Sequence, residues 1–135
     1  MSPITGRKVL ITRAESDSLQ WANQLRALGA EPIIFPCIVC SLEDDPAVAS
    51  RLTAALRSAT WLILCSRRAV QAVAALMAQS DSRLPETVRV ACVGPSTEAQ
   101  ARQLLGRSDL RATGGTAASL CAELGEILDT SDQVI

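Results

Sequence analysis

Small polar and basic residues follow the most apolar run of this chain, and their chemistry suits the binding of an anion. Cys65 and Ser66 come directly after the run at 61–64, and Arg68 lies two residues further on. Hydroxyl and guanidinium groups donate hydrogen bonds to carboxylates and phosphates. The pattern predicts a buried parallel strand followed by a helix whose first amide groups point to the same place, so we expect Ser66 and Arg68 to line a binding crevice.

Two glycine-containing turns repeat this arrangement further along the chain. One spans 94–97 after the apolar segment 88–93, and the other spans 114–116 after the segment 110–113. Neither contains the Gly-Lys-Ser/Thr of a P-loop or the GxGxxG of a dinucleotide fold. Each turn alone is typical of an ordinary strand-to-helix loop. Three such turns at one sheet edge predict a shared site, to which Gly94, Ser96 and Thr97 contribute, and Arg13 follows the first strand in the same way.

The absence of histidine narrows the chemistry that the chain can perform. It removes the commonest general acid or base, the commonest metal ligand and every Ser/His or Cys/His nucleophile. Cys37 and Cys40 match the spacing of a redox or zinc motif, but residues three apart on an extended segment point to opposite faces, and no second pair completes a zinc site. We expect no metal and no cofactor, and we expect the five cysteines to be buried thiols.

Composition and charge describe a globular domain of ordinary size. The 135 residues are 48% hydrophobic and 20% charged, with a formal net charge of −1. This balance gives no field that attracts nucleic acid or an anionic membrane. No apolar run approaches the roughly 20 residues that span a bilayer, and the amino terminus lacks the apolar core of a signal peptide. We therefore predict a cytoplasmic protein with neither nucleic acid nor membrane as partner.

Apolar runs and helical periodicity alternate along the whole chain. The predicted strands are 7–13, 31–35, 61–64, 88–93 and 110–113, each followed by a helical pattern or a turn into one. Ser16, Asp17 and Ser18 offer caps for the first helix, whose apolar stripe includes Leu19 and Leu28. The alternation predicts an α/β fold with a flavodoxin-like parallel sheet and helices on both faces, and the pattern alone favours one continuous five-stranded sheet.

The last three residues resemble the start of a further strand. Gln133, Val134 and Ile135 follow a polar loop and supply only two apolar positions, which is short for a strand. This pattern favours a chain that is truncated at its last strand. The alternative is a frayed tail.

The ordered motifs resemble one family across nearly the whole chain. They are VLITR at 9–13, LGAEP at 28–32 leading to Phe35-Pro36, LCSxxAV at 64–70, and VGxxT at 93–97 followed by Ala99. In this order and spacing they are similar to the amino-terminal half of uroporphyrinogen-III synthases. The resemblance implies a two-domain fold in which residues 1–36 form a strand-helix-strand part of the first α/β domain. Residues 37–42 would then be an extended interdomain linker, and 43–135 the second domain.

The resemblance also implies a reaction and a partner. Enzymes of that family cyclise hydroxymethylbilane, a linear tetrapyrrole with many carboxylates, to uroporphyrinogen III, with inversion of the last pyrrole ring and loss of water, in haem biosynthesis. They use neither metal nor organic cofactor. By match to the family's loops, Ser66 and Arg68 would face the cleft, and Thr97 would be a catalytic hydroxyl donor or a substrate contact. Cys65 stands where many relatives have threonine, and the tyrosine of the returning half is absent.

Two further expectations follow from this assignment. The isolated chain should be inactive, because the cleft would lack most of one wall. An incomplete first domain would also expose apolar strand edges, which predicts self-association.

The alternative is a non-catalytic flavodoxin-like or receiver-like ligand-binding module. Thr12 to Glu15 lacks the clustered aspartates that a receiver needs at this position. The chain also has few aromatic residues that could sandwich a flavin.

Overall fold

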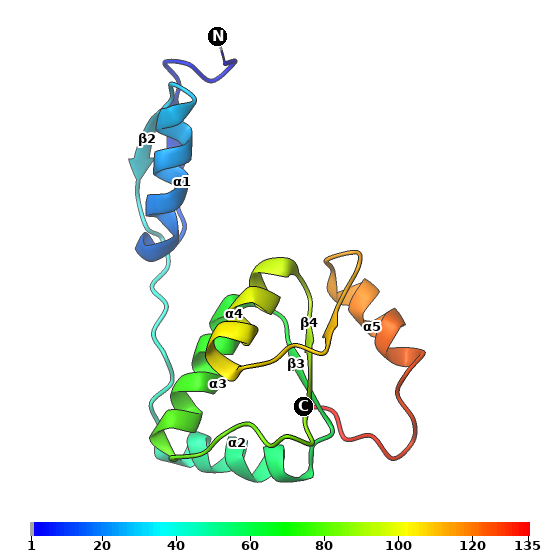
Figure 1. Cartoon of the computed structure of the whole chain (residues 1–135). Helices are drawn as coiled ribbons and strands as arrows, with labels where there is room; N and C mark the ends of the chain where they lie inside the picture. Colours follow the sequence, from blue (N-terminus) through cyan, green and yellow to red (C-terminus); the bar gives the residue numbers. More distant parts are fainter. Residues whose placement is uncertain (1) are drawn as a thin grey trace. The chain divides into compact units, whose positions relative to one another are not determined.

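The computed structural model describes residues 2–135 and divides the chain into two compact units. The first unit ends at Ser41 and the second spans Leu42–Ile135. Figure 1 shows the elements of both units along the chain. No helix among the described residues is long and apolar enough to cross a membrane.

The first unit is a strand-helix-strand motif. Its elements are β1 (Lys8–Ile11), α1 (Glu15–Ala27) and β2 (Glu31–Ile34). The two strands pair in parallel, with Lys8 opposite Glu31 and Ile11 opposite Ile34. Gly29 ends the turn after α1 at a φ of +83°, a conformation that favours glycine. The two parallel strands joined by a helix, which the alternating pattern predicted, are therefore present.

The start of α1 differs from the expected capping. The helix begins at Glu15 after Ala14, and no side chain caps it. Ser18, predicted as a possible cap, is instead fully buried, and its hydroxyl group bonds to the carbonyl oxygens of Arg13 and Ala14. The predicted stripe is also wrong in part, because Leu19 is 57% exposed while Ala22 is buried.

The second unit is a three-stranded parallel sheet with helices on both faces. Its elements are α2 (Pro46–Ser58), β3 (Trp61–Leu64), α3 (Arg67–Gln79), β4 (Arg89–Cys92), α4 (Pro95–Leu105), β5 (Leu110–Arg111) and α5 (Ala117–Gly125). The strand order is β3-β4-β5. Asp45 caps α2 by accepting a hydrogen bond from the Ala47 amide at 2.8 Å, and Pro46 follows it at the first position of the helix.

Alternate residues of the strands build two separate cores. Leu62, Leu64 and Val90 pack with residues of α2, α3 and α4 on one face. Trp61 and Ala91 pack with α5 on the other face. Figure 1 shows α5 across the sheet from α3 and α4. The predicted parallel α/β arrangement with helices on both faces is confirmed for this unit.

The five strands do not form one sheet. Among residues 2–135, β1 pairs with β2, and β4 pairs with both β3 and β5. The continuous five-stranded sheet that the pattern alone favoured is therefore wrong. Periodicity identifies a strand but does not determine which strands pair with it. The residues between β2 and α2 have no regular secondary structure.

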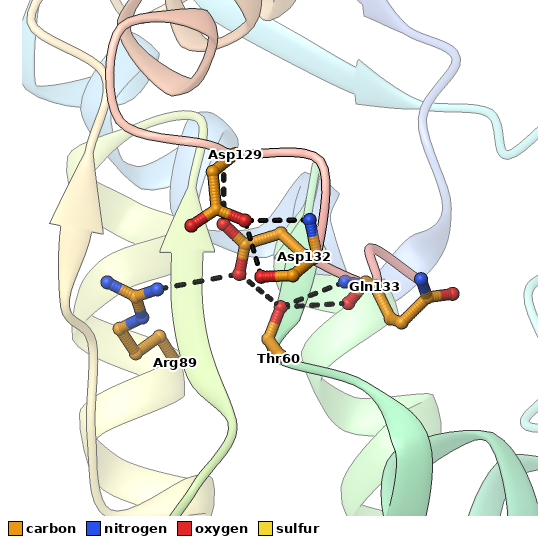
Figure 2. Close-up of polar contacts among 6 residues, drawn as sticks. Thr60, Arg89, Asp129, Asp132 and Gln133 are labelled. Carbon is orange, nitrogen blue, oxygen red and sulfur yellow. Dashed lines mark hydrogen bonds and ion pairs between the residues drawn. The ribbon is translucent and has the colours of Figure 1, made fainter.

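The last residues of the chain pair with β3 and are not a frayed tail. Val134 forms a parallel bridge with Trp61, and the Ile63 amide donates to the Ile135 carbonyl group at 2.8 Å. Figure 2 shows the polar cluster that holds this segment. In it, the Thr60 hydroxyl group bonds to an Asp132 oxygen at 2.6 Å, and the Arg89 guanidinium lies 3.6 Å from the same carboxylate.

The cysteines depart from the expectation of buried thiols. Cys92 alone is buried among the five, and burial raises the pKa of its thiol. Cys37, Cys40, Cys65 and Cys121 are exposed. Their apolar sequence contexts misled the prediction, because neighbours along the chain do not determine the direction of a side chain. No group of three or more metal-ligating side chains occurs in the part of the chain that the structure describes.

Candidate functional site

The carboxyl ends of the strands in the second unit lie together at one edge of the sheet. Leu64, the last residue of β3, is opposite Cys92 of β4, which in turn is opposite Arg111 of β5. The helices α3, α4 and α5 begin within a few residues of these ends. The positive ends of three helix dipoles and their first amide groups therefore gather at this edge, which we call the carboxyl edge.

Ser66 begins α3 and lies at the carboxyl edge. Its hydroxyl oxygen accepts a hydrogen bond from the Ala69 amide at 3.1 Å, so the side chain caps the helix. Both Ser66 and the preceding Cys65 are exposed. Because the cap uses only the oxygen as an acceptor, the hydroxyl proton remains able to bond to an anion.

The start of α4 offers backbone groups in place of a capping side chain. Gly94 is the N-cap residue, no side chain caps the helix, and Pro95 at the first helical position has no amide hydrogen. The amides of Ser96 and Thr97 then remain for water or a ligand in the first turn. A side chain added at Gly94 would meet nothing within 4 Å, so glycine leaves this helix start open without being required by packing.

Ser96 and Thr97 differ in accessibility. Ser96 is exposed, whereas Thr97 is 5% exposed and is one of the few buried polar residues in the described chain. Ser96 can therefore contact a ligand from solvent. Thr97 lies in the first turn of α4, and its burial leaves little of its surface for a ligand to contact.

The third turn at the carboxyl edge is tightly packed. A Cβ atom added at Gly114 would lie 2.9 Å from the Cβ and Oγ atoms of Ser119, and Gly115 has a φ of +63°. The Thr116 hydroxyl oxygen caps α5 by accepting a hydrogen bond from the Ser119 amide. The Ser119 hydroxyl oxygen accepts one from the Thr116 amide, which completes a capping box. Gly114 is therefore needed for the close approach of the turn to α5, whereas Gly115 is favoured by its positive φ.

Charges of both signs lie near the carboxyl edge. Arg67 and Arg68 occupy the first turn of α3, with Arg68 half-buried. Glu98 in the first turn of α4 is paired with Arg102 at 3.0 Å and with Arg111 at 3.4 Å. The two guanidinium groups offset the negative charge of Glu98, so the edge keeps its attraction for an anion.

Arg13 belongs to the first unit, apart from the residues above. It follows β1, its guanidinium lies 3.4 Å from Asp17, and it stacks over the Trp21 ring at 5.2 Å from the ring centre. The structure thus brings Cys65, Ser66, Arg68 and the turn at 94–97 to one edge. It describes Arg13 within its own unit only.

Sequence reasoning missed one carboxylate close to this region. Glu123 of α5 accepts hydrogen bonds from the Thr113 amide at 2.9 Å and from the Thr113 hydroxyl group at 2.7 Å. These bonds hold the pKa of Glu123 below its usual range. Thr113 and Glu123 are ten residues apart, so no local pattern in the sequence indicates that they form a hydrogen bond.

A separate hollow of about 410 Å³ lies between the carboxyl-terminal halves of α3 and α4. Its lining includes Met77, Leu104 and Leu105, with Ser82 and Arg83 from the following loop. The carboxyl ends of these helices lie at the opposite edge of the sheet from the carboxyl edge, so this hollow is distinct from the candidate site.

These features define a flavodoxin-like α/β protein whose candidate ligand site is the carboxyl edge of a parallel sheet. The family model described as uroporphyrinogen-III synthase HemD matches residues 20–135. The chain therefore belongs to the uroporphyrinogen-III synthase family.

Two curated relatives agree with this family. A uroporphyrinogen-III synthase from Synechococcus elongatus is 36% identical over 96 residues, which is 70% of this chain and 36% of that protein. A porphyrin biosynthesis protein HemD from Ruminiclostridium josui is 28% identical over 97 residues, which is 70% of this chain and 19% of that protein. The chain thus matches about a third or less of the length of these relatives.

Proposed function

We propose that the chain forms part of a uroporphyrinogen-III synthase and that the carboxyl edge of its second unit binds carboxylates of hydroxymethylbilane. The family match over residues 20–135 carries this proposal. The site supports it because a substrate rich in carboxylates needs many hydrogen-bond donors. The edge provides the Ser66 hydroxyl group, the uncapped first turn of α4 and the guanidinium of Arg68.

The same donors suit the reaction that the resemblance implies. Loss of water from a hydroxymethylpyrrole is chemically easy, so catalysis rests on holding the linear substrate with the correct carbon against its reaction partner. Fixed amide and hydroxyl groups at the carboxyl edge would hold the side-chain carboxylates. The hydroxyl group of Thr97, a residue in the first turn of α4, would donate to the departing hydroxyl oxygen.

We also propose that the 135-residue chain does not catalyse the cyclisation by itself. The carboxyl edge supplies one wall of donors, and the matched relatives are much longer than the segment that they share with this chain. A substrate held on one side keeps most of its conformational freedom and closes without inversion, which is the spontaneous route to the type I isomer.

Cyclisation of hydroxymethylbilane by the purified chain tests this second proposal. We expect the ratio of type III to type I product to equal that of a protein-free control, measured by chromatography of the oxidised porphyrins. Formation of the type III isomer above the control would contradict the proposal of inactivity. The binding of carboxylates to the carboxyl edge is a separate claim, and its test does not depend on turnover.

A further inference from the structure

Arg111 places a guanidinium group at the carboxyl edge, two strands away from the end of β3. It is the last residue of β5 and lies opposite Cys92, the last residue of β4. Neighbouring strands are about 4.8 Å apart, so the ends of β3 and β5 are roughly 10 Å apart. The side chain of Arg111 is 48% exposed. Arg111 therefore lies at the same edge as Ser66, at a separate point along it.

Glu98 holds this guanidinium group from one side. Its carboxylate oxygen Oε2 lies 3.4 Å from Nη1 of Arg111. The other carboxylate oxygen, Oε1, accepts a hydrogen bond from Arg102 at 3.0 Å, and Arg102 also donates to the carbonyl oxygen of Ser108 at 3.4 Å. Both oxygens of Glu98 are therefore engaged, and the carboxylate is fixed between the first turn of α4 and the end of β5.

The other side of the Arg111 guanidinium group is available to a ligand. Nε and Nη2 of an arginine form a planar fork that matches the two oxygens of a carboxylate. The ion pair with Glu98 uses Nη1, and neither Nε nor Nη2 of Arg111 bonds to another residue in the described part of the chain. Arg111 can thus bind a second carboxylate without losing Glu98. Because the ion pair already restricts the side chain, less conformational entropy is lost on binding.

We propose that Arg111 binds a carboxylate of the tetrapyrrole through Nε and Nη2, as a second anchor beside Ser66. This inference rests on the proposed function of the carboxyl edge. The carboxylates of hydroxymethylbilane are distributed along the molecule, so two of them can be held at separate points. Two anchors roughly 10 Å apart fix the orientation of the substrate between them, whereas a single anchor leaves it free to rotate. Ring closure at the correct carbon requires such a fixed orientation.

Arginine side-chain NMR of the full ¹⁵N-labelled chain during titration with uroporphyrin III tests the contact directly. The Nε–H signal of Arg111 is assigned by its absence from the spectrum of Arg111→Gln. We expect this signal to shift over the same ligand concentrations as the amide signal of Ser66. The Nε–H signal of Arg57 should not move, because Arg57 lies in the last turn of α2, next to the amino end of β3.

The affinities of three variants separate a forked contact from a general effect of charge. Arg111→Gln should weaken the binding of uroporphyrin III by roughly fivefold, a modest loss because the contact is partly exposed to solvent. Arg57→Gln removes the same charge at the opposite edge and should leave the dissociation constant unchanged. Arg111→Lys keeps the charge but not the fork, so its affinity should lie between those of Arg111→Gln and the unaltered chain. Circular dichroism of each variant confirms that it is folded.

Three results would overturn this inference. One is a shift at Ser66 together with an Arg111→Gln affinity equal to that of the unaltered chain or of Arg57→Gln, which would leave the proposed function of the edge in place. Another is an Arg111→Lys affinity equal to that of the unaltered chain, which would show that charge alone acts. The third is the absence of any shift at the carboxyl edge, which would overturn the proposed function as well.

Discussion

At the scale of single residues, the carboxyl edge combines groups that stabilise the fold with groups that remain available to a ligand. Ser66 does both, because its oxygen accepts the capping bond of α3 while its proton can still be donated. Thr97 is buried in the first turn of α4, so its accessible surface is small. Of the residues selected from the sequence, those at 65–68 and 94–97 lie at the carboxyl edge, since the carboxyl ends of parallel strands must lie together, whereas Arg13 belongs to the first unit.

Thr97 gives the first prediction at this scale. In a complete enzyme that contains this chain, Thr97→Val should lower kcat/KM by roughly tenfold, the effect of about one lost hydrogen bond. Valine has the shape of threonine, so urea unfolding should change little. Thr97→Ser keeps the hydroxyl group and serves as the control. Equal kinetics for the valine and serine variants would remove Thr97 from the site.

Asp109 gives a prediction on pH. Arg107 donates two hydrogen bonds to its carboxylate, at 2.7 and 2.9 Å, and the Val90 amide donates a third at 2.7 Å. Led by the bond from Arg107, these contacts hold the pKa of Asp109 below its usual range. A folded-state pKa below the unfolded one stabilises the protein above the unfolded pKa of about 4. This stabilisation is lost as the pH falls through the folded pKa.

The measurement is urea unfolding of the chain and of Asp109→Asn at several pH values. We expect the variant to be less stable by about 1 kcal/mol at pH ~7, a modest figure because solvent screens this partly exposed pair. The difference should shrink as the pH falls below the unfolded pKa and through the folded pKa, where the folded carboxylate also binds the proton. A difference that is independent of pH would show that the ion pair contributes nothing.

At the scale of elements, the sequence predicted most strands and helices, because their periodicity is local. The strand at 61–64, the helix after it and the capped start at Asp45 follow from patterns within a few residues. Contacts between distant segments were not predictable in this way. Thr60 and Asp132 are 72 positions apart, and nothing near either residue indicates that one bonds to the other. Periodicity alone missed the split into two sheets for the same reason, whereas the family resemblance implied two domains.

The turn before α5 gives a prediction at this scale. Gly114→Ala should destabilise the second unit by about 1–3 kcal/mol, because the new methyl group would overlap Ser119 in the capping box. Gly125→Ala, at the end of the same helix, places its methyl group in open space and should be neutral or slightly stabilising. Thermal unfolding of both variants tests this prediction. Equal melting temperatures would show that the turn accommodates the methyl group without loss of stability.

At the scale of the whole molecule, each compact unit contains one tryptophan. Trp21 of the first unit is 50% exposed, and Trp61 of the second is 2% exposed. The first unit buries mainly small residues, such as Ala14, Ala22 and Ala30, whereas the second has two cores. A domain of about 40 residues rarely buries enough surface to be stable alone. The two units should therefore differ in stability.

Indole NH signals in ¹⁵N-resolved NMR spectra report on each unit without any substitution. During a urea titration of dilute chain, we expect the native signal of Trp21 to vanish at a lower concentration than that of Trp61. Loss of both signals at the same urea concentration would indicate one cooperative unit instead of two.

The central claim is that the carboxyl edge of the second unit binds carboxylates of a tetrapyrrole. Amide NMR shifts during titration with uroporphyrin III test it most directly, because each donor reports separately. We predict shifts at Ser66, Ser96 and Thr97, and their loss in Ser66→Asp, which keeps the helix cap but repels the ligand. Shifts confined to the hollow beside Arg83, or binding that Ser66→Asp leaves unchanged, would contradict the claim.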